Sequence, residues 1–216
     1  MSRHETLIRE LARDLRPVVR LPRLRGIAAA VAGTAGLAAG LYVGVPVLLG
    51  GAVEAPGRLE VTIGSSHVVL AAGAVLLALA SAVPGRRTLE RVGLAGACLG
   101  AALVLLSVPA VREAALAGLG SGAVCALKAT LLALVPAAVL LRFVAAAEPF
   151  SPSRTLLFGA VGALSLGALP VHLACPLEGS LHWLVGHSLA PLTGGVLLFV
   201  ALRLFYRPVA DLLRSD

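Results

Sequence analysis

Cysteine and histidine side chains in the last third of the chain have the types and spacing that bind a soft metal ion. His172 and Cys175 lie three residues apart, which places both on one face of a helix and suits chelation of a single ion. His182 and His187 follow shortly after Pro176. Thiolates combined with imidazoles favour zinc, copper(I) or another heavy metal, and exposed thiols of low pKa favour redox sensing. The spacing matches no standard zinc motif, and the alternative is that the cysteines pack in a core and the histidines in an interface.

A second thiol, Cys125, is followed three residues later by Lys128, the one lysine of the chain. A charge inside an apolar segment costs about 2.5–3.5 kcal/mol on insertion scales. On the same helix face, the ammonium would favour the thiolate form of Cys125. The alternative is that Lys128 extends outward to water or to loop carbonyls. Cys98 has the surroundings of a small packed hydrophobe, and three cysteines cannot all pair within one chain.

The segments that must position these residues are long and apolar. Apolar residues make up 58% of the 216, with mean hydropathy +0.95, against about 45–50% in soluble domains. Crossing a bilayer takes roughly 20 apolar residues. The sequence predicts an all-α polytopic membrane protein, a bundle of six transmembrane helices over 26-205, with spans at about 26-48, 65-84, 92-111, 118-141, 155-174 and 183-204.

Arginines give this bundle an orientation. Of the seventeen, fifteen lie in segments 1-25, 85-91, 142-154 and 203-216, and Arg58 and Arg112 occupy the other two charged gaps. Because cytoplasmic loops collect arginine, both termini, including the tail 206-216, are predicted to be cytoplasmic. The soft side chains then converge on the outer side of the membrane, where the candidate metal ligands are Cys125, His172, Cys175, His182 and His187.

The N-terminal residues predict a short amphipathic helix. Ser2-x-x-Glu5 is a helix-start signal, Leu7, Leu11 and Leu15 recur on one face, and Pro17 ends the pattern. A helix of about fourteen residues is marginal alone in water. It therefore needs a partner, which is another protein, the bundle or the lipid surface.

Several function classes are disfavoured. The net charge of +7 is what the positive-inside rule and anionic lipid produce, so direct nucleic-acid binding is not expected. No Asp or Glu lies well inside a predicted span, which argues against a proton-coupled transporter. No nucleophilic triad, phosphate loop or dinucleotide fingerprint is present, so the chain is not expected to be an enzyme. Gly36-x-x-x-Gly40 has a helix-packing spacing, but with 24 glycines the spacing also recurs by chance, as at Gly96 and Gly100.

Three short motifs together resemble a known family. They are Asp14-Leu15-Arg16-Pro17-Val18 before the first span, Cys125 early in the fourth, and His172-Leu-Ala-Cys175-Pro176 at the end of the fifth. They resemble the six-span bacterial anti-sigma factors of the negative-regulator-of-sigma-F type, which include the membrane anti-sigma factor of the myxobacterial light-induced carotenoid response. The resemblance covers nearly the whole chain.

The resemblance implies a protein that holds an extracytoplasmic-function sigma factor at the bacterial inner membrane and releases it on an envelope, metal, light or oxidative stimulus. Segment 1-25 would be the sigma-binding arm, with the leucines as anchors in a groove of the sigma factor. Cys125 and Cys175 would be the sensing pair. The implied sigma-binding residues are Leu7, Leu11, Arg13, Asp14, Leu15, Arg16, Pro17 and Val18.

The main alternative is an inner-membrane redox protein that binds a metal or haem on the outer side through both cysteines and its outer histidines: His67, His172, His182 and His187. A small transporter subunit or scaffold is the third interpretation.

Overall fold

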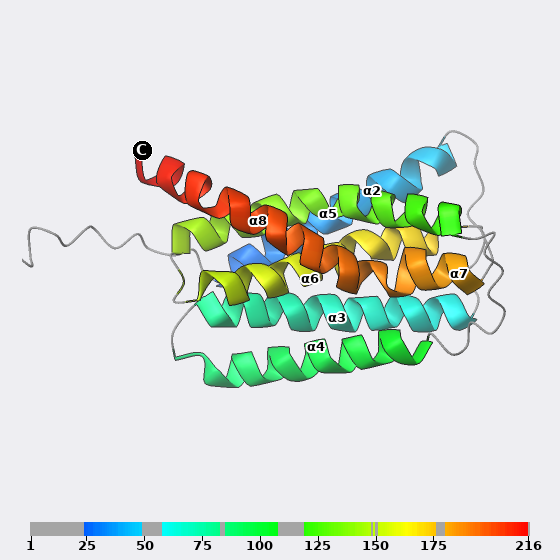
Figure 1. The fold of residues 1–216 in the computed structure, drawn as a ribbon, viewed down its shortest axis with the longest axis horizontal. Coiled ribbons are helices and arrows are strands. Elements are labelled where there is room, and N and C mark those ends of the chain that lie inside the picture. Colours follow the sequence, from blue (N-terminus) through cyan, green and yellow to red (C-terminus); the bar gives the residue numbers. More distant parts are fainter. Residues whose placement is uncertain are drawn as a thin grey trace, which may run out of the picture.

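The computed structural model describes residues 24–48, 58–82, 85–107, 119–147, 149, 151–175 and 180–215. They form a bundle of roughly parallel and antiparallel helices (Figure 1), and the described part contains no strand. The elements in chain order are α2 (Leu24–Leu48), α3 (Arg58–Ala82), α4 (Arg87–Ser107), α5 (Leu119–Ala147), α6 (Pro152–Leu173), α7 (Ser180–Trp183), the π-helical turn η3 (Leu184–Ser188) and α8 (Ala190–Ser215). The all-helical prediction is confirmed.

Six of these helices are long and apolar enough to cross a membrane, as predicted. Their candidate spans are Gly26–Val45, Ile63–Ala82, Arg87–Leu106, Gly120–Ala147, Pro152–Leu173 and Ala190–Leu212. The first five lie within about two turns of the predicted limits. The predicted N-terminal helix and the sigma-binding residues of segment 1-25 lie in 1–23, outside the described residues. At the other end, α8 continues as helix through most of the segment predicted as a tail.

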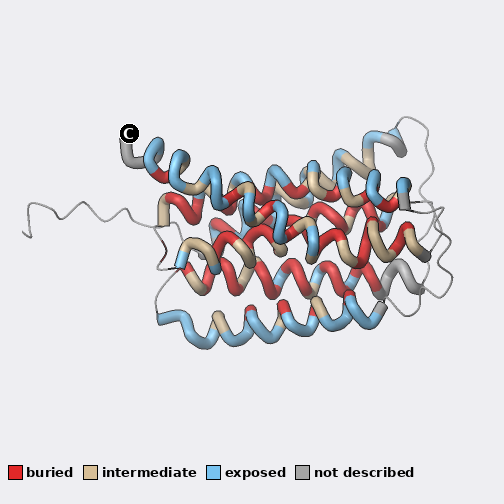
Figure 2. The backbone as a smooth tube through the Cα atoms, viewed as in Figure 1, coloured by how far each residue is buried: buried red, intermediate tan, exposed pale blue. Residues whose placement is uncertain are grey.

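α3 and α6 form the centre of the bundle. In each, 67% of the most apolar window is buried, against 11% for α2 and 17% for α8. Figure 2 shows the same contrast along the tube, with the outward side of α4 exposed. The outer helices therefore present apolar side chains to the surroundings, as lipid-facing helices do.

Glycines allow α3 and α4 to pack closely. A Cβ on Gly73 or Gly100 would collide with the facing backbone at Ala97 or Leu70, and one on Gly93 would lie 2.6 Å from the amide nitrogen of Leu77. In lipid, such close backbone approach favours helix association through van der Waals packing. Gly96 and Gly100 thus make real contacts, whereas Gly36 has nothing within 4 Å of a Cβ. The glycine pattern alone did not separate these two cases.

The sixth span differs most from its prediction, because a π-helical turn separates α7 from α8. Pro191 explains part of this break. Proline has no amide hydrogen, so the carbonyl of His187, four residues earlier, cannot receive its usual helical hydrogen bond. The imidazole of His67 on α3 occupies that carbonyl instead, with Nε2 at 2.8 Å from the oxygen. The interruption therefore ties η3 to the bundle centre.

Candidate metal centre

Four soft donors meet at one end of the bundle, where α7 lies in Figure 1. Cys125 comes from the first turns of α5, Cys175 from just beyond the end of α6, His182 from α7 and His187 from η3. One ligand atom from each lies within 4.8 Å of the other three. Both cysteines are free thiols. The structure thus brings together four of the five candidate ligands predicted from the sequence.

The spacing of the donors fits a tetrahedral ion. Ligand bonds of about 2.3 Å to sulfur and about 2.0–2.1 Å to nitrogen separate the donors of a tetrahedron by about 3.8 Å (S···S), about 3.6 Å (S···N) and about 3.3 Å (N···N). The observed separations are 3.7 Å between the two sulfurs, 3.1 Å from Cys175 Sγ to His182 Nε2, and 3.2 Å between the Nε2 atoms of His182 and His187. These three separations lie within about 0.5 Å of those of a two-thiolate, two-imidazole tetrahedron, and the other three are at most 4.8 Å.

Glycines bring η3 onto α5 and so set this spacing. A Cβ on Gly186 would lie 2.9 Å from the carbonyl oxygen of Gly122 and 3.2 Å from the Cβ of Cys125. A Cβ on Gly122 would lie 3.0 Å from the carbonyl oxygen of His182. Cβ atoms almost never approach other atoms so closely, so a side chain at either position would push α7 and η3 away from Cys125. The close approach places the two histidines over the thiol.

His182 is oriented by a hydroxyl. Its Nδ1 lies 2.9 Å from Ser121 Oγ, and with Nδ1–H donating to that oxygen, the lone pair is on Nε2, the atom that faces the thiols. Ligand histidines commonly donate their second nitrogen in this way, which fixes the ring and its tautomer. Burial lowers the pKa of His182 below its ordinary value. The imidazole is therefore neutral near pH 7 and has a lone pair for a metal.

The rings of His172 and Trp183 pack against the donor His187. His172 contacts Trp183 edge to face at 4.8 Å between ring centroids, and His187 lies 5.2 Å from His172 and 5.1 Å from Trp183. His67 is fully buried and its ring lies 5.8 Å from that of His172. These contacts hold His187 in place. On the thiol side, Cys125 belongs to an apolar cluster with Ala129, Ala168 and Val171, against which Tyr42, Leu132 and Cys175 pack.

One sequence expectation differs from the structure. His172 and Cys175 were expected to chelate one ion from a single helix face, but α6 ends at Leu173 and Cys175 lies beyond it. His172 therefore supports the group through ring contacts and is not among its four donors. Lys128 lies three residues after Cys125 on the continuous helix α5, as expected for a shared face. Its side chain is exposed while Cys125 is buried, as in the alternative that it extends outward.

Sequence reasoning missed Ser121, Trp183 and the glycine pair 122 and 186. Ser121 precedes Cys125 by four residues, which puts both on one helix face, so this signal was available. The glycine pair carries no local signal, because only the packing of η3 on α5 gives it a role.

The same ring contacts argue against haem. A haem needs a slot for its macrocycle beside the axial ligand, and here the imidazoles of His182 and His187 lie 5.1 Å apart between centroids, with Trp183 and His172 packed on the second ring. The donor set among the described residues thus fits a single ion and does not fit haem.

Comparison of the chain with protein-family models, with curated proteins and with solved structures gives no match.

Proposed function

We propose that this protein is a membrane-bound anti-sigma factor that binds a thiophilic metal ion at Cys125, Cys175, His182 and His187 and changes its hold on a sigma factor in response. The metal-binding part of this proposal rests on the mutual approach of the four ligand atoms, which all lie within 4.8 Å of one another. The sigma-binding part rests on the amphipathic pattern of segment 1-25 and on the resemblance to membrane anti-sigma factors.

Charge balance favours a soft divalent ion. Two thiolates and two neutral imidazoles carry a total charge of −2, so a divalent cation makes the occupied site neutral. Neutrality matters here because Cys125 is 6% exposed and is surrounded by apolar side chains, where an uncompensated charge is costly. Thiolate ligands select Zn²⁺, Cd²⁺ and Cu⁺ over hard ions such as Mg²⁺.

Metal binding is the first test. The full-length protein in detergent or nanodiscs, stripped with chelator and kept reduced, is expected to bind one Cd²⁺ per chain with a thiolate-to-metal absorption band in the ultraviolet. Cys125→Ser and Cys175→Ser should each reduce this band because each removes a thiolate, and His182→Ala should weaken Cd²⁺ binding because it removes an imidazole donor. Cys98→Ser is the matched control, since Cys98 is an exposed free thiol on α4. A band that survives the loss of both site cysteines would contradict the proposed site.

α2 is the route from this site to the arm. Tyr42 of α2 packs, as Cys175 does, against the cluster that contains Cys125, and the same helix begins at Leu24, at the end of segment 1-25. α2 is also the least buried of the six candidate spans. A change in the packing of Tyr42 can therefore be passed along α2 to its start, where Ile27 and Val31 pack in the bundle core.

Sigma binding is the second test. The full-length protein is expected to capture an extracytoplasmic-function sigma factor from the same organism, and Leu11→Asp should abolish capture by placing a charge on the anchoring face. Adding Cd²⁺ should weaken capture by 5- to 150-fold, the usual range of allosteric coupling. Tyr42→Ala should retain metal binding but lose this response, while Leu41→Ala, an exposed position beside it at 57% exposure, should behave as wild type. Undiminished capture after deletion of residues 1-25 would exclude the arm.

The second candidate function is a resident metal site of structural or redox use. The preformed donor spacing and the Ser121 contact favour it, because permanent sites are typically built this way. It predicts that the protein is isolated with stoichiometric metal, and that removing the ion lowers thermal stability without altering sigma capture. Metal-dependent capture would exclude this candidate as the sole role.

A further inference from the structure

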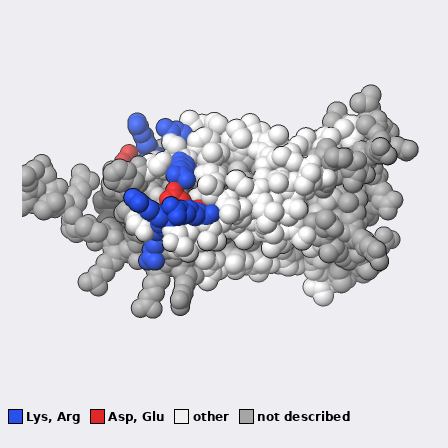
Figure 3. All heavy atoms as spheres, turned by 90° about the horizontal axis from the view of Figure 1, so that it is seen from below, with Lys and Arg blue, Asp and Glu red and all other residues white. Residues whose placement is uncertain are grey.

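The opposite end of the bundle contains an arginine-lined cavity that the metal site and the arm do not use. Its volume is about 330 Å³, and it lies between the first turns of α4 and α6. Figure 3 shows basic side chains gathered at this end of the face, with uncharged residues over the rest of the visible, described part. The lining residues are Arg87, Glu90, Arg91, Leu94 and Arg154.

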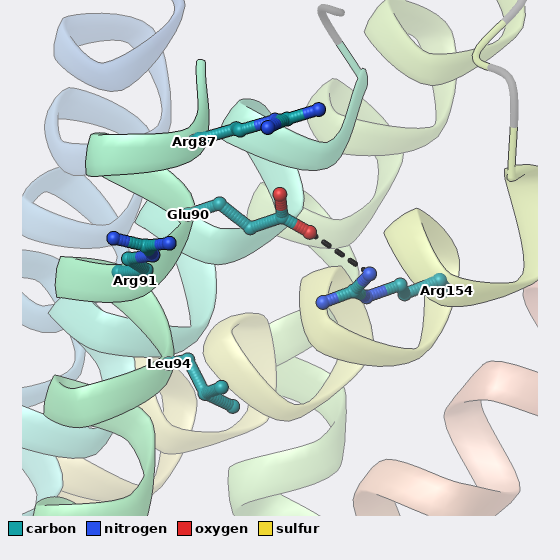
Figure 4. Close-up of a pocket in the computed structure, with 5 residues that line it drawn as sticks. All are labelled: Arg87, Glu90, Arg91, Leu94 and Arg154. Atoms are coloured by element: carbon teal, nitrogen blue, oxygen red, sulfur yellow. Dashed lines mark ion pairs between the residues drawn. The ribbon is translucent and has the colours of Figure 1, made fainter. Parts of the chain in front are cut away.

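The cavity is electropositive. Three arginines line it against one carboxylate, Glu90, which pairs with Arg154 at 2.8 Å (Figure 4). That pair is partly exposed, at 45% for Arg154 and 32% for Glu90, so it is open to a competing anion. Guanidinium groups bind phosphate oxygens through two parallel hydrogen bonds. The cavity therefore suits a phosphate that replaces Glu90 as the partner of Arg154 and also contacts the two arginines of α4.

An apolar surface continues from the cavity along α4. Leu94 lines the cavity itself and is 43% exposed, and further along the same face of α4 Cys98 is exposed and Leu105 is 51% exposed. α4 runs the length of a membrane span from this charged end. A ligand that fits both parts carries an anionic headgroup on long hydrocarbon chains.

We propose that this cavity binds the headgroup of an anionic phospholipid, with Arg87, Arg91 and Arg154 on the phosphate and the acyl chains along the exposed side of α4. Basic pockets between transmembrane helices at the membrane surface are common sites for anionic lipid. The proposal is independent of the function proposed for the metal centre.

The Glu90–Arg154 pair gives a decisive test. If the pair only holds α4 to α6, Glu90→Gln and Arg154→Gln break it alike and have the same effect. If the cavity binds lipid phosphate, Glu90→Gln removes the competing carboxylate and strengthens lipid binding, while Arg154→Gln weakens it. The two substitutions must then act in opposite directions.

The experiment measures phosphatidylglycerol bound to the full-length protein by native mass spectrometry, after equilibration with mixed phosphatidylglycerol and phosphatidylcholine. We expect preferential retention of phosphatidylglycerol, about fivefold weaker in Arg91→Gln and in Arg154→Gln, and stronger in Glu90→Gln. Arg86→Gln is the matched control, because Arg86 is an exposed arginine beside Arg87 that does not line the cavity. A second arm adds glycerol 3-phosphate, which should not displace the lipid because it lacks acyl chains.

Three results would overturn the proposal: equal retention of the two lipids, equal effects of Glu90→Gln and Arg154→Gln, or an effect of Arg86→Gln as large as that of Arg91→Gln. Displacement by glycerol 3-phosphate would instead assign the cavity to a soluble phosphate and would also overturn the lipid proposal.

Discussion

At the residue scale, the metal centre depends on two positions without side chains. Gly186→Ala places a methyl group 2.9 Å from the Gly122 carbonyl oxygen and 3.2 Å from the Cβ of Cys125. Overpacking of this kind costs about 1–3 kcal/mol, and here relief means moving His187 away from the thiol. We expect weaker Cd²⁺ binding and a lower melting temperature. Gly36→Ala is the control, since nothing lies within 4 Å of its Cβ. Equal losses in both variants would refute the role of the close approach.

Sequence reasoning could select the donors but not arrange them. Cys125, Cys175, His182 and His187 stood out because soft side chains are rare in an apolar chain and the arginine pattern put them all at one end. Their grouping depends on where α6 ends and on how η3 packs against α5, and both are set by tertiary packing. The helical i, i+3 rule therefore favoured His172, which the structure uses as a packing ring.

At the element scale, η3 forms in part because Pro191 has no amide hydrogen to donate to the His187 carbonyl, which accepts a hydrogen bond from His67 instead. Pro191→Ala restores an amide hydrogen that competes for that carbonyl, so we expect the turn to become more α-helical and His187 to move from its position near His182. Loss of a supporting contact typically lowers metal affinity 10- to 100-fold. Cd²⁺ titration checks this. Pro208→Ala is the control within the same helix α8, and a loss there of equal size would show only a general effect on the helix.

The six spans were predictable because hydropathy and length dominate helix formation in a membrane. The break before α8 was not, since apolar residues continue through Leu184 and Val185 and hide the change in hydrogen bonding. The hydrophobic pattern of a sequence shows which residue types recur along a helix. It does not show which backbone carbonyl lacks its helical hydrogen-bond donor.

At the scale of the whole molecule, the soft donors and the arginine cavity occupy opposite ends of the bundle. The positive-inside rule then predicts that Cys175 faces the outer side and Arg207 the cytoplasm. In a background with Cys98 and Cys125 changed to serine, a membrane-impermeant maleimide should label Cys175 in right-side-out vesicles. Arg207→Cys, with Cys175 also changed to serine, should react only after the vesicles are opened. The reverse pattern would invert the topology and place the metal site in the cytoplasm.

The order of the donors along the chain has a consequence for biosynthesis. Segment 1-25 leaves the ribosome before any of the donors, and the last donor, His187, follows it by about 160 residues. At 5–20 residues per second, the intervening synthesis takes on the order of 10 s. If the arm binds sigma as proposed, a nascent chain can begin to capture its partner before the input site is complete. Newly made molecules would then hold sigma regardless of the stimulus until His187 has been made and has packed.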